Sequence, residues 1–427
     1  FSIQQADRAK VFLVDASAGS VVVSGDSETL GQGFPVFIVK TALDNSVTFQ
    51  GISAQIVDGA ASKTISAQYG SLGLVSIGAA GWQTVMASNI GDFTSAVSFS
   101  DTVEFKSGHS VVGGPIIRPM GRMTLSSGTP VLTAASTTAQ TTFYYTPFLG
   151  NRIPLPTDFG WTVGAFTEIS QTLSDASKSP AAGAPSTVYD VFVWLDGDSP
   201  VVSRGFPWAT ASSRGTGPGT TEIVRVDGVK VNKYAITNGP DANRGVLVGT
   251  ISTSASGANG QLNMMFNPTP AAGGTDNRLD VFNEFNRVPV TANSRDATNS
   301  WTYTTETVRS AGGSTSSRVT LVIGSSEEPV RASYRAHASS VSAGVFFRAG
   351  VGRNVTNAFD GSPGQADYAS FSTGIAIYGN DSGQPLPEGS NFLQALEWSQ
   401  AASTVTWYGD NGAPTLQQAM LTVEAMM

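Results

Sequence analysis

Short runs of strand-type residues, separated by Gly- and Pro-containing turns, are the feature that most constrains this fold. The pattern is densest in residues 121–155, where 123–125 reads as a short strand and 141–145 collects β-branched and aromatic residues. Such residues fit a pleated, half-buried surface. Pro147 and Gly150 then close the stretch, as turn residues do. This alternation of strand and turn residues predicts an all-β fold. The stretch contains no acid–base pair, metal-binding cluster or phosphate loop.

Composition agrees with a turn-rich β protein. Charged residues make up only 13% of the chain, about half of the ~25% that is usual in globular proteins. The 40% hydrophobic content is enough for sizeable cores, and 427 residues predict two or three domains. We therefore expect β-sandwich (jelly-roll-like) modules, a small N-terminal β-module and few short helices.

Charge and cysteine content exclude several classes of function. A net charge of −8 argues against binding nucleic acid through phosphate neutralisation, which needs clustered Lys and Arg. The absence of cysteine excludes disulfides, thiolate metal sites and cysteine nucleophiles. No apolar run approaches the ~20 residues of a membrane-spanning helix. The sequence begins with Phe1 instead of Met, so it is open whether the natural polypeptide has a further N-terminal piece, such as an attachment segment.

The spacing of strands and turns predicts four regions. Residues 1–87 are expected to form the small β-module, for attachment or trimerisation, and 88–120 a linker with short strands. Residues 121–295 are expected to form a central β-rich domain, and 296–427 a C-terminal β-sandwich region. Asp196-Gly197 predicts a hairpin turn. Residues 279–285 (LDVFNEF) are the best helix candidate, and 168–173 a second short one.

Several segments occur in an order that resembles a known module. They are 121–155, 187–194 (TVYDVFVW), 205–208 (GFPW), 226–229 (VDGV), 286–289 (NRVP) with 300–305 (SWTYTT), and 396–412 (LEWSQAASTVTWYGDNG). The module is found in tail fibre and minor structural proteins of tailed bacteriophages and phage-like gene transfer particles. The resemblance implies a homotrimeric tail fibre or head spike on the virion surface, made in the bacterial host cytoplasm. It implies contact with other virion proteins through the N-terminal region, and it brings no catalytic residues and no known receptor.

Residues 1–87 resemble a second, smaller β-module that recurs in phage fibres and often trimerises. The matching segments are VDASAGSVVV, GFPVFIVKT, VDGAASKTISAQYGSLGLVS and GWQTV. In similar sequences a Leu-Pro turn follows the strand that matches residues 21–23. Here residues 24–28 read SGDSE, so the shape of the first turn is open.

Candidate nucleophiles and bases are few. His109 and His337 are the only imidazoles, they lie far apart in sequence, and ordinary surface or core positions are favoured for both. Gly25-Asp26-Ser27 and Gly197-Asp198-Ser199 spell the GDS core of one esterase family. That chemistry needs a base placed for the serine, and the sequence supplies none. Both triplets read as turns between strands.

Carboxylates and glycines give weaker candidates. Asp196/Asp198, Glu327/Glu328 and Asp276/Asp280 are possible glycosidase pairs, but adjacency in sequence does not place two carboxylates across a cleft. Neither Asp196-Gly197-Asp198 nor Asp410-Asn411-Gly412 continues to the glutamate of an EF-hand loop. Gly350-Val351-Gly352, with Arg348 and Arg353, lacks the helix that a phosphate loop needs. We therefore predict no catalytic residue, no cofactor and no metal.

Seven tryptophans remain: Trp82, Trp161, Trp194, Trp208, Trp301, Trp398 and Trp407. Exposed tryptophans can stack on sugars, whereas buried ones anchor a sandwich core and contribute a large apolar area. A core position is therefore predicted for each. Trp407-Tyr408 is the best candidate for a surface pair.

Three functions stay open. The first is a non-enzymatic fibre or spike that adheres to the host surface, with polysaccharide as the expected receptor and an unknown binding site. The second is a capsule depolymerase, and the third is a structural decoration or connector. The sequence does not decide between head and tail attachment.

Overall fold

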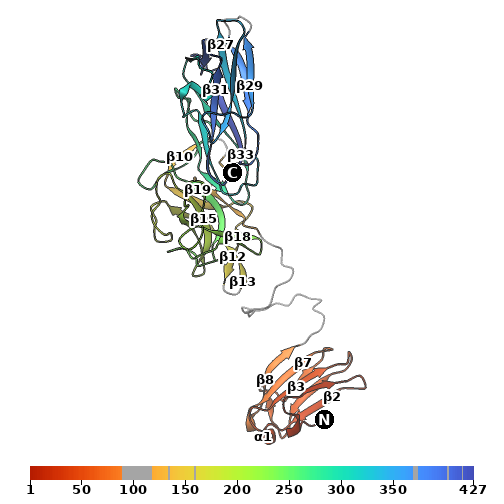
Figure 1. Cartoon of the computed structure of the whole chain (residues 1–427). Coiled ribbons are helices and arrows are strands. Elements are labelled where there is room, and N and C mark those ends of the chain that lie inside the picture. The colour runs from red at the N-terminus through yellow and green to blue at the C-terminus, as the bar shows by residue number, and fades with distance from the viewer. Residues whose placement is uncertain (89–117, 133–134, 158–159, 369–373, 402, 416) are drawn as a thin grey trace. The chain divides into compact units, whose positions relative to one another are not determined.

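The computed structural model describes residues 1–88, 118–132, 135–157, 160–368, 374–401, 403–415 and 417–427 (Figure 1). The chain divides into two compact units, Phe1–Glu104 and Phe105–Met427. Nearly all regular structure in the described residues is β-strand, which confirms the predicted all-β class. Most of the predicted linker, 88–120, lies outside the described residues.

The N-terminal unit contains two sheets. The larger has the strand order β1-β3-β7-β8-β5, and the smaller β2-β4-β6. The strands are β1 (Val11–Val14), β2 (Val21–Gly25), β3 (Pro35–Lys40), β4 (Val47–Gly51), β5 (Ile56–Val57), β6 (Ser62–Ile65), β7 (Ser71–Ser76) and β8 (Gly81–Ser88). The helical turns are η1 (Gln5–Asp7), α1 (Ser27–Leu30) and η2 (Gly78–Ala80).

The core of this unit follows from the alternation of its strands. In β3 every second side chain is buried, so Val36 and Ile38 point inward together with Phe34 just before the strand. Trp82 is fully buried against Phe49, with ring centroids 5.1 Å apart in an edge-to-face arrangement. These residues form a hydrophobic cluster separate from that of the second unit.

The first turn of this unit is helical, which corrects the reading of Gly25-Asp26-Ser27 as a turn between two strands. Asp26 caps α1 by accepting hydrogen bonds from the backbone N–H groups of Glu28 and Thr29. It also accepts a bond from the Thr29 hydroxyl at 2.6 Å. A capping aspartate satisfies helical N–H groups that otherwise have no partner.

The second unit begins with small sheets followed by a larger one. β9 (Gly121–Thr124), β11 (Thr142–Pro147) and β14 (Ile169–Thr172) form one, and β12 (Arg152–Thr157) and β13 (Gly160–Ala165) form another. A further sheet has the order β16-β15-β19-β18-β17, with β22 beside β19. Its strands are β15 (Val188–Asp196), β16 (Ser199–Pro207), β17 (Ile223–Val226), β18 (Val229–Asn232), β19 (Val246–Ser252) and β22 (Val281–Asn283).

The remaining strands form a 14-stranded arrangement, counted over the described residues. One layer contains β10 (Thr137–Gln140), β20 (Leu262–Met264), β21 (Asn277–Leu279), β25 (Arg309–Ser310), β26 (Arg318–Ile323), β28 (Val345–Arg353), β29 (Asp360–Tyr368) and β31 (Gly389–Ser399). The other contains β23 (Pro289–Arg295), β24 (Ser300–Tyr303), β27 (Arg331–Ser340), β30 (Ile375–Asn380), β32 (Val405–Tyr408) and β33 (Met420–Met426). The turn η3 (Ala311–Gly313) precedes β26.

The two layers make a sandwich. In the described chain, strand pairing between the two layers is limited to one residue pair, Ser362 of β29 with Asn380 of β30. Elsewhere they meet through side chains: Phe347 of β28 lies edge-to-face on Trp407 of β32, with centroids 5.9 Å apart. Every second residue of β27 and β33 is buried in this core, as a sheet with one covered face requires.

Both helix candidates of the second unit are wrong. Residues 168–173 contain β14, and 279–285 contain the end of β21 and all of β22. Leu279, Val281 and Phe282 are all buried, because this segment lies between sheets and buries side chains on both faces. An isolated helix this short is marginal, and strand pairing satisfies the same backbone groups. The hairpin at Asp196-Gly197 is confirmed, with Gly197 at φ 62°.

The predicted boundary at 295/296 stays a prediction, although strands on its two sides share one layer, since β23 pairs with β33. None of the helices formed by the described residues has the length and apolarity that crossing a bilayer requires.

Candidate functional site

The candidate histidines do not form a catalytic or metal site in the described chain. His109 lies outside the described residues. His337 is half-buried in β27, where burial and the nearby Arg335 guanidinium lower its pKa. Within the described part of the chain, no three His, Cys, Asp or Glu residues come together to hold a metal ion.

The two GDS serines have different surroundings. Ser27 is fully buried, and its hydroxyl donates to the Gly78 carbonyl at 2.6 Å, so it is a structural group. Ser199 is exposed beside Asp198 at the tip of the β15–β16 hairpin. Asp196 of the same hairpin pairs with Lys178. The pair Asp196/Asp198 therefore lies exposed on a hairpin turn.

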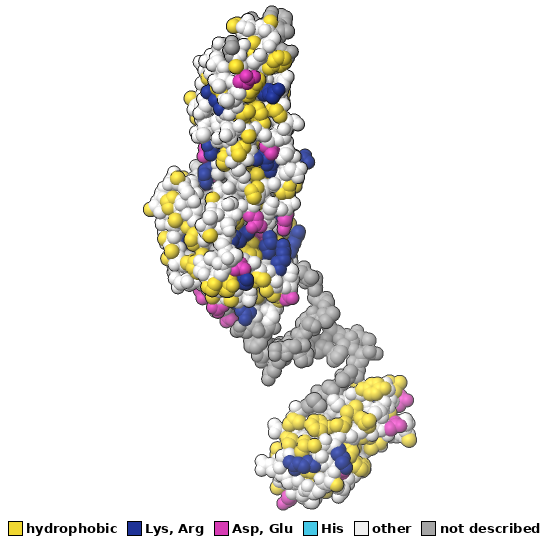
Figure 2. All heavy atoms as spheres, viewed as in Figure 1, with side chains coloured by type: hydrophobic (Ala, Val, Ile, Leu, Met, Phe, Trp, Pro, Cys, Tyr) yellow, Lys and Arg dark blue, Asp and Glu magenta, His cyan; other side chains and the backbone are white. Residues whose placement is uncertain are grey.

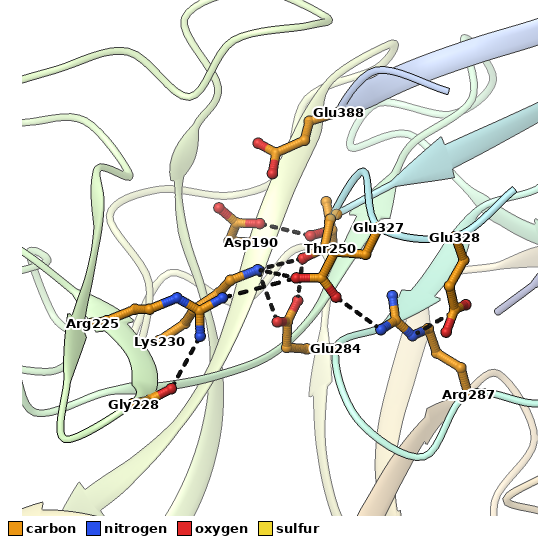
Figure 3. A network of polar contacts seen from close by, with 12 residues as sticks. Asp190, Arg225, Gly228, Lys230, Thr250, Glu284, Arg287, Glu327, Glu328 and Glu388 are labelled. Atoms are coloured by element: carbon orange, nitrogen blue, oxygen red, sulfur yellow. Dashed lines mark hydrogen bonds and ion pairs between the residues drawn. The ribbon is translucent and has the colours of Figure 1, made fainter. Parts of the chain in front are cut away.

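Glu327 and Glu328 belong to an extended charge network (Figure 3). Arg287 lies between them, with its Nη2 3.1 Å from Glu327 Oε2 and its Nε 3.6 Å from Glu328 Oε2. Lys230 of β18 contacts Glu284 at 2.9 Å and Glu327 at 3.9 Å. The hydrogen bond from Arg287 lowers the pKa of Glu327, which keeps this carboxylate ionised. A carboxylate held this way is poorly suited to donate a proton.

The network continues to a buried ion pair. Asp190 of β15 is fully buried and accepts from Arg214 Nε at 2.6 Å and from the Thr250 hydroxyl at 2.7 Å. Arg214 also pairs with Glu388, which directly precedes β31. It donates to the carbonyl of Gly324, which directly follows β26, at 2.8 Å. The network therefore ties the β15–β19 sheet to loops of the sandwich. Because each of these acids has a cationic partner, its evident role is structural.

The remaining acidic candidates also have structural partners. Asp280 is buried, and burial raises its pKa to about 6 against the opposing effect of Arg278, whose Nη2 lies 2.8 Å away. Asp276 is exposed and accepts from the Thr320 hydroxyl at 3.0 Å. Asp410 accepts from the Gly412 N–H at 2.8 Å within its own turn. The contacts of these three carboxylates are with a hydroxyl, a guanidinium and a backbone N–H group, which are structural partners.

Gly350, Gly352, Arg348 and Arg353 lie on β28, so the faint phosphate-loop pattern is strand sequence. Arg353 pairs with Asp381, and Arg348 lies over the Trp398 ring at 5.1 Å.

Three tryptophans, Trp82, Trp208 and Trp407, are almost completely buried. Trp407 is therefore a core residue, and the predicted surface pair Trp407-Tyr408 is wrong in its first member. Adjacent residues of a strand point to opposite faces, so Tyr408 points outward. The other four tryptophans, Trp161, Trp194, Trp301 and Trp398, are half-buried.

Tyr408 belongs to the outer side of the layer that contains β27. Strands β23, β33, β27 and β30 are neighbours in this order, and alternate residues of each point outward. We call this surface the β27 face; its residues are Thr291, Asn293, Arg295, Met420, Thr422, Glu424, Arg331, Ser333, Arg335, His337, Ala376, Tyr378 and Asn380.

Strand register arranges these side chains in rows across the sheet. One row is Arg295, Met420, Arg335 and Tyr378, and Tyr378 is 61% exposed. The next row consists of hydroxyl and amide groups: Asn293, Thr422, Ser333 and Asn380. The third places Thr291 and Arg331 on either side of Glu424.

A cavity of ≈ 380 Å³ opens at one end of these rows, within the range of about 300–1,000 Å³ that is typical of ligand sites. Its walls are Arg331, Ser333, Thr422, Glu424 and the turn 380–383. The turn is fixed from below, because Asp381 pairs with Arg353 and accepts from the Ala332 N–H at 2.9 Å. The site is therefore a polar pocket on a rigid sheet, with hydroxyl, amide, carboxylate and guanidinium groups facing it.

Sequence reasoning did not find this face. The alternation of residues 331–338, RASYRAHA, is the signal that was available, since every second position is polar. The neighbours contributed by β23, β33 and β30 come from distant parts of the sequence and depend on strand register.

No protein-family model matches the chain, and no curated protein matches it significantly. Among solved structures, a structure of infectious bursal disease virus, Gx strain, matches with 12% identity and a TM-score of 0.19, covering 68% of this chain and 74% of that chain. A TM-score this low does not establish a shared fold. The resemblance to phage virion proteins therefore stays a prediction.

Proposed function

We propose that this protein is a non-enzymatic virion fibre or spike protein of a phage or phage-like particle, which adheres to polysaccharide on the host cell surface. The β27 face carries the adhesion part of the proposal. Its hydroxyl, amide and guanidinium groups are the donors and acceptors that sugar hydroxyls require. The sequence resemblance supports the virion assignment and localisation on the virion surface, with other virion proteins as partners.

The state of the candidate carboxylates supports a non-enzymatic role. Glu327 and Glu328 are paired with Arg287, and Asp196/Asp198 lie on a hairpin tip. Two glycosidase carboxylates must instead face each other across a cleft about 5–10 Å wide. A capsule depolymerase is the weaker alternative for this reason.

Exposed apolar side chains support a homotrimer formed with the help of the N-terminal unit. Val11 and Leu13 on β1 are 59% and 71% exposed, and Leu43 is 73% exposed. Figure 2 shows apolar side chains gathered over the visible face of the unit that contains residues 1–88. Large apolar patches on soluble proteins mark interaction sites, and several copies of a weak glycan site would add avidity.

The oligomeric state is measured directly by sedimentation equilibrium. We expect a mass about three times the 44.2 kDa of one chain. Replacing Leu13 and Leu43 by Glu should release monomers, because charges would then lie in the contact. A monomeric or dimeric wild-type protein would contradict the trimer.

The adhesion proposal is tested by binding of the labelled protein to candidate host cells with and without their capsule. Saturable binding that disappears with the capsule is the expected result. Loss of capsule during incubation would favour the depolymerase. Absence of binding to all capsulated and bare hosts would overturn adhesion and leave a structural connector.

A further inference from the structure

The charged side chains of the β27 face are mostly cationic. Three arginines, Arg295, Arg331 and Arg335, point outward, and Glu424 is the one outward carboxylate on these strands. His337, Tyr378 and Tyr408 are the other titratable groups on this side of the layer. At the pocket edge Arg353 pairs with Asp381 and also lies 3.8 Å from Asp360. The face is therefore locally positive on a chain with a net charge of −8.

These arginines form no close ion pairs, although Glu424 is the cross-strand neighbour of Arg331. Across the described residues, no carboxylate forms an ion pair with Arg295, Arg331 or Arg335. Arg335 donates from Nε and Nη2 to the Gln418 carbonyl at 3.1 and 3.0 Å, and Arg295 donates to the Pro268 carbonyl at 2.8 Å. A guanidinium has five N–H donors, so these contacts fix both side chains and leave donors unused. Some other arginines of this unit are ion-paired, for example Arg214, Arg278, Arg287, Arg309 and Arg353, whereas Arg204 donates to backbone carbonyls.

Strand geometry spaces the positive charges. Arg295 and Arg335 are two strands apart in one row, which corresponds to roughly 10 Å. Arg331 lies four residues from Arg335 on β27, roughly 13 Å along the strand. Between the charges are the hydroxyl and amide groups of Ser333, Thr422 and Asn380. A ligand that complements this surface carries anionic groups at intervals on a scaffold rich in hydroxyls.

We propose that the β27 face binds acidic polysaccharide, with its three arginines contacting carboxylate or phosphate groups along the glycan. The proposal rests on the proposed adhesion function and specifies its ligand. Arginine binds both kinds of anion with paired hydrogen bonds. The pocket beside Arg331 and Glu424 receives a sugar ring, and its polar groups bind the hydroxyls.

The test uses the full-length protein and three polymers: alginate, which carries carboxylates, poly(glycerol phosphate), and neutral dextran. We expect binding to one or both anionic polymers, weakened at least about tenfold between 50 and 500 mM NaCl by screening, and no binding to dextran. Arg331→Gln should weaken binding about tenfold, as expected for loss of a charged hydrogen bond. Arg335→Gln should do the same, with partial recovery in Arg335→Lys.

Arg152→Gln is the matched control, since Arg152 is an exposed arginine on β12 of the same unit. It should leave binding unchanged. Unfolding midpoints of all variants show whether the fold is intact. Arg331 is the decisive position because, within the described chain, its guanidinium makes no hydrogen bond or close ion pair that the substitution would remove. Equal binding to dextran, no salt dependence, no binding to either anionic polymer, or an unaffected Arg331→Gln would overturn the proposal. If the wild type still binds capsulated cells in that event, adhesion stands and only the ligand assignment fails.

Discussion

Glu397 is a buried acid in the core of the sandwich. It lies fully buried in β31, accepting from Trp301 Nε1 at 2.8 Å and from Arg309 Nε at 2.7 Å. Burial raises its pKa from 4.5 to about 6, against the opposing effect of Arg309. The folded protein therefore holds this proton more tightly than the unfolded chain does.

The raised pKa of Glu397 predicts the direction of a pH effect. A carboxyl group whose pKa is higher in the folded state stabilises the fold below the unfolded pKa, and this contribution is lost as pH rises through the folded pKa. Between pH 4 and 7.5, across both pKa values, the stability difference between wild type and Glu397→Gln should change by about 2 kcal/mol to the disadvantage of the wild type. Urea unfolding of both proteins from pH 4 to 7.5 measures the difference, in which other titrating groups cancel. Parallel pH profiles would contradict this assignment.

Arg204 is a second buried charge, with a role in backbone structure. Its Nη2 donates to the carbonyls of Leu173, Asp175 and Ala181 at 3.0, 2.8 and 3.2 Å, and the guanidinium lies 5.3 Å from the Tyr189 ring centroid. The side chain thereby holds the segment 173–181 against β16.

Replacing Arg204 by Met should lower the free energy of unfolding by about 2–4 kcal/mol, because carbonyl groups lose their donor in a buried place. Equilibrium urea unfolding measures this loss, and Arg152→Met serves as the exposed control. The segment 173–181 should also become sensitive to limited proteolysis. An unchanged unfolding midpoint would show that water replaces the guanidinium without cost.

At the scale of elements, local sequence signals predicted an all-β chain, whereas strand register was not predicted from the sequence. The β15–β16 hairpin is confirmed because its Asp-Gly turn and alternating flanks act within one short segment. The helix prediction for residues 279–285 is wrong. Four apolar positions in seven are compatible both with the apolar face of a helix and with two short strands that are buried on both faces.

The candidate site was harder to predict than the strands that build it. The outward side of β27 shows its alternation in sequence, with Ala332, Ala336 and Ala338 buried opposite polar residues. Alanine marks an inner face only weakly, so this signal is faint. The pocket needs Glu424, Asn380 and Arg331 together, and only the pairing of β27 with both β30 and β33 brings them there.

At the scale of the whole molecule, the two units have separate hydrophobic cores. Each core contains a fully buried tryptophan in a similar setting. Trp82 donates to the Gly25 carbonyl and packs on Phe49, and Trp407 donates to the Ser399 hydroxyl and packs on Phe347. Units without a shared core should unfold independently.

Calorimetry should therefore show two unfolding transitions. Trp82→Phe should lower only one of them and Trp407→Phe only the other, each by several degrees, as expected for a loss of about 2 kcal/mol. The two variants are controls for each other. A single transition, or a joint shift of both transitions in either variant, would show that the units are thermodynamically coupled.

The position of β33 has a consequence for biosynthesis. Residues 420–426 lie between β23 and β27, which are made about 130 and 90 residues earlier. During translation, the edges of β23 and β27 that pair with β33 stay unpaired while about one hundred further residues are added. Unpaired strand edges can pair with other chains. Nascent chains on ribosomes that translate the same mRNA are therefore at risk of pairing with one another. The layer of the sandwich that contains β23, β27 and β33 can be completed only when residues 420–426 have left the ribosome.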